Sequence, residues 1–279
     1  MLQNDRVTDR NPQAREMADE SMVRNLAAQI EAIWPQEEAL VRRYRATSVL
    51  DVGCGTGEFT RRAAELFPQA RVVGVDLIEE HLALARRLSD PRVVYQQADA
   101  FELPFEAGAF DLVVCRHVLQ AIPQAPRVLA EMVRVCRPGG VLHVIPEDYH
   151  MIFAAPTRID VGRFWFEAPR AYAAASGTDL FIGRNIFHHL RARLLEEIDI
   201  QYVHVDTQRV PRETFARIIT AWRDGYSETL AEHVAWSVDT VRDHFDATIE
   251  AIRDPDGYAL WVVPVVSARV RAAGGRAAP

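Results

Sequence analysis

Residues 49–59 read VLDVGCGTGEF, and this stretch decides the fold. The apolar run Ser48–Val52 predicts a buried strand that ends in three glycines spaced GxGxG, and residues 58–66 predict a helix directly after them. Glycine permits a sharp strand-to-helix turn and lets a ligand lie against bare backbone. The free N–H groups at the helix start favour a carboxylate or another anion. The loop therefore predicts a small-ligand site, with a spacing that differs from the GxGxxG of dinucleotide binders.

Two acids follow this loop at the ends of the next two predicted strands. Asp76 comes after the apolar run 72–75, about twenty residues beyond the glycines, where a carboxylate can accept both ribose hydroxyls. Asp99 comes just after the run 93–95, where it can accept a hydrogen bond from an adenine amino group. Each acid alone would be an ordinary loop residue or helix cap. In this order, after a glycine loop, they predict an adenosine-type ligand.

The rest of the chain alternates between short apolar runs and helical patterns, which is typical of a parallel sheet with helices on both faces. We expect a turn at 138–140, a helix over 13–44 that breaks near Pro35, and irregular structure after Pro146. The expected domains are an N-terminal helical cap at 1–45 and a Rossmann-like domain at 46–279, with insertions at about 147–180 and 207–255. The remaining predicted strands are 110–115, 141–145, 198–205 and 258–266, and the remaining predicted helices are 82–88, 128–135, 182–195, 215–230 and 238–252.

Composition limits the chemistry. The 279 residues carry a formal net charge of −7 and include no lysine, so neither a Schiff-base lysine nor a Walker lysine exists. An acidic chain also disfavours a nucleic-acid partner, because it lacks the charge that binds a phosphate backbone. The three cysteines form no CxxC pair, and no apolar run reaches the roughly 18 residues of a membrane span. We expect a cytoplasmic protein that meets a small-molecule substrate, contacts no membrane and forms a homodimer.

Five segments resemble the successive motifs of class I S-adenosylmethionine-dependent methyltransferases. They are VLDVGCGTGEFT, VVGVDL, QQADAFELPF, FDLVVCRHVLQ and RPGGVL. Among these methyltransferases, the motifs most resemble those of the group that contains the ubiquinone and menaquinone biosynthesis enzymes. The resemblance is strong over residues 47–145 and weak over the closing strands. It implies an α/β fold, a Rossmann-like seven-stranded mostly parallel sheet whose last strand is antiparallel, with S-adenosylmethionine as cofactor and S-adenosylhomocysteine as product.

The same resemblance implies a cofactor site. By this resemblance Gly53, Cys54, Gly55 and Gly57 would line the methionine part, and Asp51 would approach its amino group. Asp76 and Leu77 would hold the ribose, and Asp99 and Ala100 the adenine. Arg116 and His117 would border the sulfonium. Beyond Pro146 no further family motif is found before about Gly257.

A general base is needed only if the acceptor must lose a proton. His117 is either that base or a satisfied polar group under the cofactor, and Tyr149 and His150 are either bases or substrate anchors. Glu147 either recognises an amine or caps a helix, and Trp165 either lines the substrate pocket or belongs to the core. We expect no metal, because His188 and His189, being adjacent on a predicted helix, point in different directions.

The sequence thus predicts methyl transfer from S-adenosylmethionine to a small molecule, in secondary metabolism, with an oxygen, nitrogen or carbon acceptor left open. Three alternatives remain: a nucleic-acid or protein methyltransferase, a member that keeps S-adenosylmethionine without methylating, and an NAD-dependent oxidoreductase. The glycine spacing disfavours the last of these.

Overall fold

The computed structural model describes residues 11–13 and 20–272. Its strands and helices alternate along the first half of the chain, as expected. The strands are β1 Ser48–Val52, β2 Arg71–Asp76, β3 Val94–Gln97, β4 Phe110–Arg116, β5 Cys136–Ile145, β6 Ile152–Ala155, β7 Glu196–Asp206 and β8 Tyr258–Arg269. The helices are α3 Glu20–Val41, α4 Glu58–Leu66, α5 Glu79–Leu88, α6 Ala125–Val135, α7 Val161–Ser176, α8 Ile182–Arg191, α9 Arg212–Val234 and α10 Val238–Arg253.

Within the described residues the strands form one sheet, and its main path runs β3-β2-β1-β4-β5-β8. Strands β1 to β5 pair in parallel, whereas β8 is antiparallel to β5, to β6 and to β7. This confirms the predicted fold class with its antiparallel last strand. The strand β6 adds an eighth strand to the seven expected. It pairs with Tyr258–Trp261 at the start of β8, whereas β5 pairs with Val266–Arg269 at its end.

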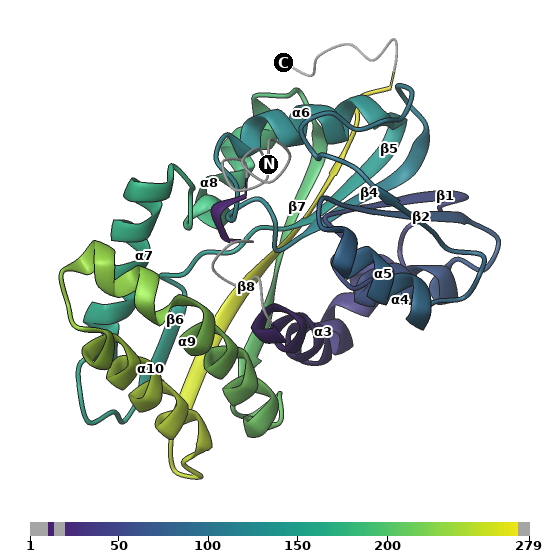
Figure 1. Cartoon of the computed structure of the whole chain (residues 1–279). Coiled ribbons are helices and arrows are strands. Elements are labelled where there is room, and N and C mark those ends of the chain that lie inside the picture. The colour runs from purple at the N-terminus through teal and green to yellow at the C-terminus, as the bar shows by residue number, and fades with distance from the viewer. Residues whose placement is uncertain (1–10, 14–19, 273–279) are drawn as a thin grey trace.

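Alternation within the parallel strands feeds two separate cores. Val49, Val72 and Val114 face one side, where they pack with Ile30 of α3 and Phe59 of α4. Their strand neighbours face the other side and pack against α6 and α8; these residues are Leu50, Val73, Val113 and Cys115. Figure 1 shows α3, α4 and α5 on one face of the sheet and α6 and α8 on the other. A strand buried on both faces reads as a continuous apolar run, as predicted.

A third core lies beyond the end of the parallel sheet. Helices α7, α9 and α10 gather around the first half of β8 and β6 (Figure 1), and α9 also packs along α3. This cluster contains most of the buried aromatic side chains, among them Phe164, Trp165, Trp222, Phe245 and Trp261. We name it the aromatic cap. The region expected to be irregular after Pro146 therefore holds a strand and a long helix.

Two local predictions were wrong. The N-terminal helix α3 does not break at Pro35 but continues through it to Val41. Pro35 is exposed, whereas Ile33 and Glu37 on either side of it are buried, so the packed face of the helix continues past the proline. The part of this predicted helix at residues 14–19 lies outside the described residues. The predicted turn at 138–140 lies inside β5 as an irregularity, where the register of β4 against β5 shifts between Phe110 and Leu112.

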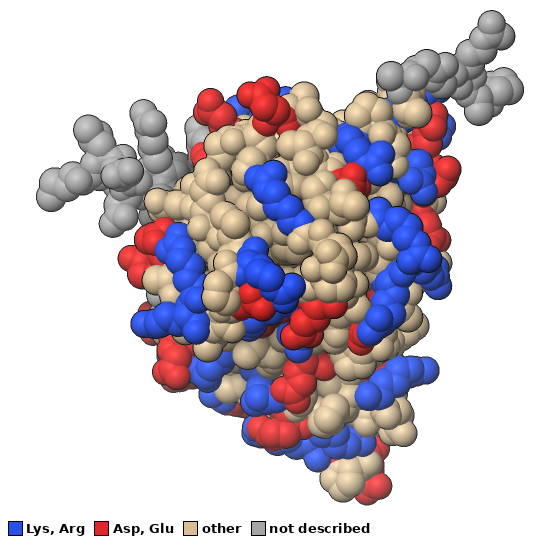
Figure 2. All heavy atoms as spheres, turned by 90° about the vertical axis from the view of Figure 1, so that its right-hand side faces the viewer, with Lys and Arg blue, Asp and Glu red and all other residues tan. Residues whose placement is uncertain are grey.

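The surface is highly charged but mixed. Figure 2 shows arginine side chains interspersed with acidic ones over one face of the molecule. No helix in the described part of the chain is long and apolar enough to cross a membrane.

Candidate functional site

The glycine loop between β1 and α4 has the conformation that its sequence predicts. Gly53, Gly55 and Gly57 have φ values of +71°, +53° and +81°, in the left-handed region that other residues avoid. A Cβ atom on Gly57 would lie 2.3 Å from the hydroxyl oxygen of Tyr95, so no side chain fits there. The loop therefore leaves its own backbone and the start of α4 accessible to a ligand that lies against it.

Asp76 ties this loop to the end of β2. Its Oδ2 accepts a hydrogen bond from the backbone N–H of Gly55 at 2.8 Å, and its Oδ1 accepts one from Ile78 at 2.9 Å. The glycine loop and Asp76, the first of the two acids that follow it in the sequence, are thus in direct contact. Asp99 is held in a similar way by the backbone N–H of Phe101, at 2.9 Å from its Oδ1.

Asp51 carries a buried carboxyl group and lies next to the last residue of β1, just before the loop. It accepts a hydrogen bond of 2.6 Å from the Thr60 hydroxyl of α4. Burial raises the pKa of Asp51 from 3.8 to about 7, despite the lowering effects of Thr60 and Arg116. A cation placed nearby would stabilise the ionised form of this group.

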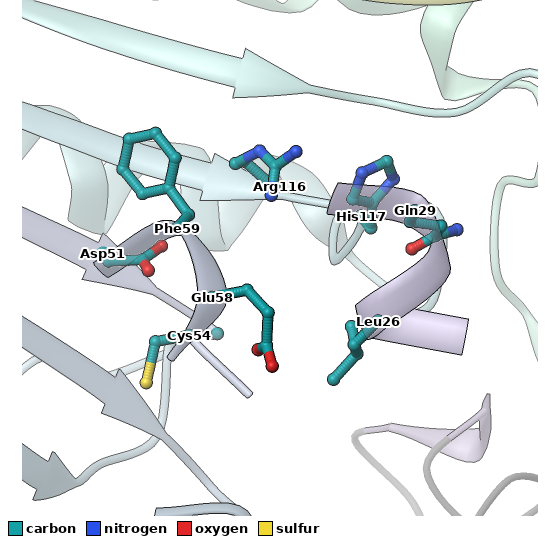
Figure 3. Close-up of a pocket in the computed structure, with 9 residues that line it drawn as sticks. Leu26, Gln29, Asp51, Cys54, Glu58, Phe59, Arg116 and His117 are labelled. Carbon is teal, nitrogen blue, oxygen red and sulfur yellow. The ribbon is translucent and has the colours of Figure 1, made fainter. Parts of the chain in front are cut away.

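A cavity opens between the glycine loop, the end of β4 and the helix α3 (Figure 3), and the space in it that no atom occupies, counted together with the solvent at its mouth, is about 340 Å³. Of the predicted cofactor residues, five line it: Asp51, Gly53, Cys54, Arg116 and His117. The other six predicted residues lie outside its lining, and they are Gly55, Gly57, Asp76, Leu77, Asp99 and Ala100. Asp76 nevertheless contacts the loop directly, as described above.

Four lining residues were not predicted. Leu26 and Gln29 come from α3, and Glu58 and Phe59 come from the first turn of α4. Glu58 and Phe59 follow the glycine loop immediately, so their position in the motif could have indicated them. The α3 residues carry no such local signal, because they precede the loop by more than twenty residues.

Arg116 at the end of β4 is anchored by Glu37 of α3. The two guanidinium nitrogens Nε and Nη2 lie 3.0 and 2.9 Å from the two carboxylate oxygens. Glu37 also accepts from His143 of β5 at 3.0 Å, and the other ring nitrogen of His143 lies 2.9 Å from the Tyr44 hydroxyl. Burial raises the pKa of Glu37, but Arg116 and His143 outweigh it and hold the pKa at about 2.

His117 follows Arg116 and adopts a left-handed backbone with φ +58°. Its Nδ1 lies 2.5 Å from Oε1 of Glu147, which follows β5, and the Gln29 amide of α3 donates to the same oxygen at 3.3 Å. Three atoms of this group are buried without a hydrogen-bond partner: His117 Nε2, Glu147 Oε2 and Gln29 Oε1. The structure thus brings together His117 and Glu147, two residues that the sequence placed thirty positions apart.

The other predicted substrate-side residues divide into two groups. Tyr149 and Trp165 are buried in the aromatic cap, where both pack against Trp222 at ring-centroid distances of 5.3 and 6.1 Å. His150 points elsewhere: it stacks on the exposed ring of Phe166 at 4.8 Å. His150 is absent from the cavity lining and packs near the surface of the protein.

Asp148 and the histidine pair have other partners. Asp148 forms an ion pair with Arg184 of α8 at 2.6 Å. His188 and His189 lie with ring centroids 6.0 Å apart. No group of three or more His, Cys, Asp or Glu side chains in the described ranges is arranged to hold a metal ion.

The comparison with known proteins agrees with this geometry. Residues 50–144 match the family described as a methyltransferase domain. A trans-aconitate 2-methyltransferase of Deinococcus radiodurans is 42% identical over 113 residues, which cover 40% of this chain and 43% of the relative. A demethylmenaquinone methyltransferase of the same organism is 35% identical over 134 residues, which cover 46% of this chain and 54% of the relative. The chain spans about half the length of these curated relatives.

Solved structures share the fold over most of the chain. A putative methyltransferase of Bacillus halodurans superimposes with a TM-score of 0.54 at 20% identity, covering 84% of this chain and 97% of that one. A phosphoethanolamine N-methyltransferase of Haemonchus contortus gives 0.53 at 22% identity, covering 85% of this chain and 53% of that one. Together these findings confirm the resemblance to the class I S-adenosylmethionine-dependent methyltransferases, and the segment 50–144 is the part that matches the methyltransferase-domain family.

Proposed function

We propose that this protein transfers a methyl group from S-adenosylmethionine to a small-molecule acceptor. The observation that carries the proposal is the charge of the cavity above the glycine loop. Two carboxyl groups, Asp51 and Glu58, line it; Glu58 also pairs with Arg61 at 3.4 Å, and the charge of the lining arginine, Arg116, is paired with Glu37. S-adenosylmethionine carries a sulfonium and an ammonium against one carboxylate, so it complements such a lining. The two phosphates of NAD would meet these carboxylates with repulsion.

The residues present fit the cofactor at both of its polar ends. The bare loop and the start of α4 suit its carboxylate, Asp51 and Glu58 suit its ammonium group, and Asp76 at the end of β2 suits its ribose. The relatives named above as methyltransferases support the same cofactor, with S-adenosylhomocysteine as its product. When bound, this cofactor supplies a methyl group that is already activated by its positive sulfur.

The protein's own residues then contribute alignment and exclusion of water. Alignment of two bound reactants can contribute about 7–11 kcal/mol to lowering the barrier. Helix α3 covers the loop from above, since Leu26 lies against Gly55 and Gln29 lines the cavity. We therefore interpret residues 1–45 as a cap on the domain 46–279, and the segments at about 147–180 and 207–255 as its substrate-side insertions. His117 and Tyr149 remain the proposed catalytic residues.

Calorimetry on the purified protein tests this proposal directly. S-adenosylhomocysteine should bind, NADH should not, and Asp76→Ala should weaken S-adenosylhomocysteine binding at least tenfold, because a hydrogen bond to a charged group contributes roughly 1.5–3 kcal/mol. Asp90→Ala is a matched control, since Asp90 is an exposed acid that pairs with Arg92 away from the cavity. Binding of NADH in preference to S-adenosylhomocysteine would overturn the proposal. Binding without methyl transfer to any acceptor would instead favour a member that keeps the cofactor without methylating.

A further inference from the structure

A second cavity lies inside the aromatic cap, and we name it the aromatic chamber. The space in it that no atom occupies, counted together with the solvent at its open side, is about 380 Å³. Its walls come from α7, α9, α10, the segment after β5 and Gln13 near the N-terminus, and its aromatic lining residues include Tyr149, Phe164, Trp165, Tyr172, Trp222 and Phe245. Within the described residues, no charged side chain lines it. A chamber of this kind binds flat apolar groups and offers no counter-charge to an anion or a cation.

The aromatic chamber and the cofactor cavity are separated by a thin layer of side chains. His117 and Gln29 line the cofactor cavity, Tyr149 lines the chamber, and Glu147 lies between them in contact with His117 and Gln29. The ring of Trp261 continues this layer, 6.3 Å from the His117 ring and 5.2 Å from the Trp222 ring. A molecule in the chamber therefore needs to pass only this layer to reach the cofactor cavity.

Unpaired polar atoms are concentrated in this same layer. Among the described residues, no hydrogen-bond partner lies within reach of His117 Nε2, Glu147 Oε2, Gln29 Oε1 or Trp261 Nε1, and all four atoms are buried. The His117 and Glu147 side chains are only 7% and 2% exposed. A buried polar atom without a partner costs about 1–3 kcal/mol, so a group of them indicates a site that a polar ligand atom completes. The left-handed backbone of His117 is a further strain that the fold maintains at this point.

The hydrogen bond to Glu147 fixes the chemistry of the His117 ring. A carboxylate oxygen only accepts, so the Nδ1 atom that lies 2.5 Å from it carries the proton and donates. The Nε2 atom then has a free lone pair and acts as a proton acceptor. A carboxylate behind the ring also stabilises the imidazolium that forms when Nε2 takes up a proton.

We propose that the acceptor is an uncharged, ring-bearing molecule that lies in the aromatic chamber and presents one ionisable hydroxyl group to His117 Nε2. This inference rests on the function proposed above. The acceptor oxygen forms a bond to the methyl carbon, and its proton moves to Nε2. The carbon–sulfur bond breaks and its electron pair stays on sulfur, which becomes neutral. His117 becomes an imidazolium that is paired with the Glu147 carboxylate, so the charge that leaves the sulfur is held by the protein.

This acceptor differs from the substrates in the names of several similar proteins. Trans-aconitate carries three carboxylates and phosphoethanolamine carries a phosphate, and either would enter a chamber whose described lining residues include no cationic side chain. Burying such charges unpaired costs far more than the aromatic contacts return. An ammonium group would find no carboxylate among the described residues that line the chamber, and only the faces of the aromatic rings would offset its loss of hydration.

Three naphthalene probes that differ only in charge test the chamber. 2-Naphthol is neutral, 2-naphthoate is anionic and 2-naphthylmethylamine is cationic at neutral pH. Binding is measured by quenching of tryptophan fluorescence and by calorimetry, on the full chain saturated with S-adenosylhomocysteine. 2-Naphthol should bind at least tenfold more tightly than either charged probe. Tighter binding of the anion or the cation would overturn the proposed acceptor class.

Two tryptophan variants locate the binding site. Trp165→Leu should weaken 2-naphthol binding at least tenfold without changing the affinity for S-adenosylhomocysteine. Trp236→Leu is the matched control, because Trp236 packs on the outside of the cap and is absent from the chamber lining. Equal effects of the two variants on 2-naphthol would place its binding elsewhere.

The role of His117 has a readout that needs no turnover. In protein with ¹⁵N-labelled histidine, 2-naphthol should shift the Nε2 resonance that disappears in His117→Gln. Glu147→Gln should lower methylation of 2-naphthol about 10²–10⁴-fold, the usual contribution of a general base, and should change its dissociation constant less than threefold. An unchanged Nε2 resonance, or an equal loss of binding and turnover in Glu147→Gln, would remove His117 as the base.

These outcomes separate the two proposals. If S-adenosylhomocysteine itself does not bind, the proposed function fails. If it binds but 2-naphthol does not compete favourably with the charged probes, only the inference about the acceptor fails.

Discussion

The carboxylate of Glu37 and the guanidinium of Arg116 form a bidentate ion pair that joins helix α3 to the carboxyl end of β4. The Glu37 side chain is 0% exposed and that of Arg116 is 9% exposed. Seventy-nine positions separate the two residues in the chain. The pair holds the helix that covers the glycine loop against the strand that ends beneath it. It therefore couples the N-terminal helix to the geometry of the proposed cofactor site.

Replacing Glu37 by alanine should destabilise the fold strongly. A buried arginine that loses its partner is left as an uncompensated charge, which typically costs about 3–5 kcal/mol. Glu38→Ala is the matched control at the next position, since Glu38 pairs with the exposed Arg42 and should cost less than about 1 kcal/mol. Urea denaturation measures both. Similar losses for the two variants would show that the ion pair does not hold α3.

The pH dependence of the same pair has a definite sign. The pKa of Glu37 is lowered from 4.5 to about 2, so the ionised form stabilises the folded state. This contribution is complete above about pH 4.5 and is lost as the pH falls towards about 2. The stability difference between the wild type and Glu37→Gln should therefore shrink as the pH is lowered through this range, in denaturation measured at successive pH values. A difference that stays constant would contradict the assignment.

Asp51 should make cofactor binding depend on pH near neutrality, well above the range in which Glu37 titrates. Because burial raises its pKa to about 7, the carboxyl is mostly protonated at about pH 5.5 and half ionised at about pH 7. A cationic ligand prefers the ionised form, so the affinity for S-adenosylmethionine should increase about tenfold over this interval. Calorimetry checks this, with Asp51→Asn as the control that should bind weakly and without this pH dependence.

Gly57→Ala and Gly139→Ala separate backbone strain from collision. Both glycines have a left-handed φ, of +81° and +78°, so both substitutions should cost about 1–2 kcal/mol from strain. Only at Gly57 does the added Cβ meet another group, the Tyr95 hydroxyl at 2.3 Å, and nothing lies within 4 Å at Gly139. Thermal denaturation should show the larger loss for Gly57→Ala, and Tyr95→Phe should restore part of it. An equal loss at both positions would mean that the loop relaxes around the methyl group.

Pro35→Ala should stabilise the protein. Alanine supplies the backbone N–H that Pro35 lacks in the middle of α3, and proline inside a helix is about 3 kcal/mol less favourable than alanine. Alanine also gives the unfolded chain more conformational freedom, which offsets part of this difference. We therefore expect the free energy of unfolding to rise by about 1–2 kcal/mol in denaturation experiments. Pro169→Ala in α7 is the contrasting case, because Pro169 is buried and its ring fills space in the cap. Its gain should be smaller or absent.

The sequence predicts the part of the fold in which local pattern and position coincide. Strand β1 and helix α4 have the predicted bounds, because a strand, a glycine loop and a helix start are each marked by neighbouring residues. The same local signals identify Asp51, Arg116 and His117 as lining residues. Glu37 and Gln29 carry no such mark. Their roles depend on contacts made across 79 and 118 positions, which only the packing of α3 onto the sheet creates.

The continuity of α3 through Pro35 was missed for a related reason. Intrinsic propensity predicts a break there, and the tertiary contacts of the buried face override it. The strand β6 was missed because four residues are too short for a recognisable alternation. It exists because the first half of β8 extends past β5 and leaves an edge to be paired.

The walls of the two cavities come from different stretches of the chain. Most of the wall of the proposed cofactor cavity lies in or beside residues 50–144, the segment that matches the methyltransferase-domain family, whereas the aromatic chamber is built from residues between Tyr149 and Phe245 together with Gln13. Under the proposed function, change in the later stretch would therefore alter which acceptor is used while the earlier stretch stays intact. Redesign for a new acceptor should begin on α7 and α9, with the glycine loop and its surroundings left as they are.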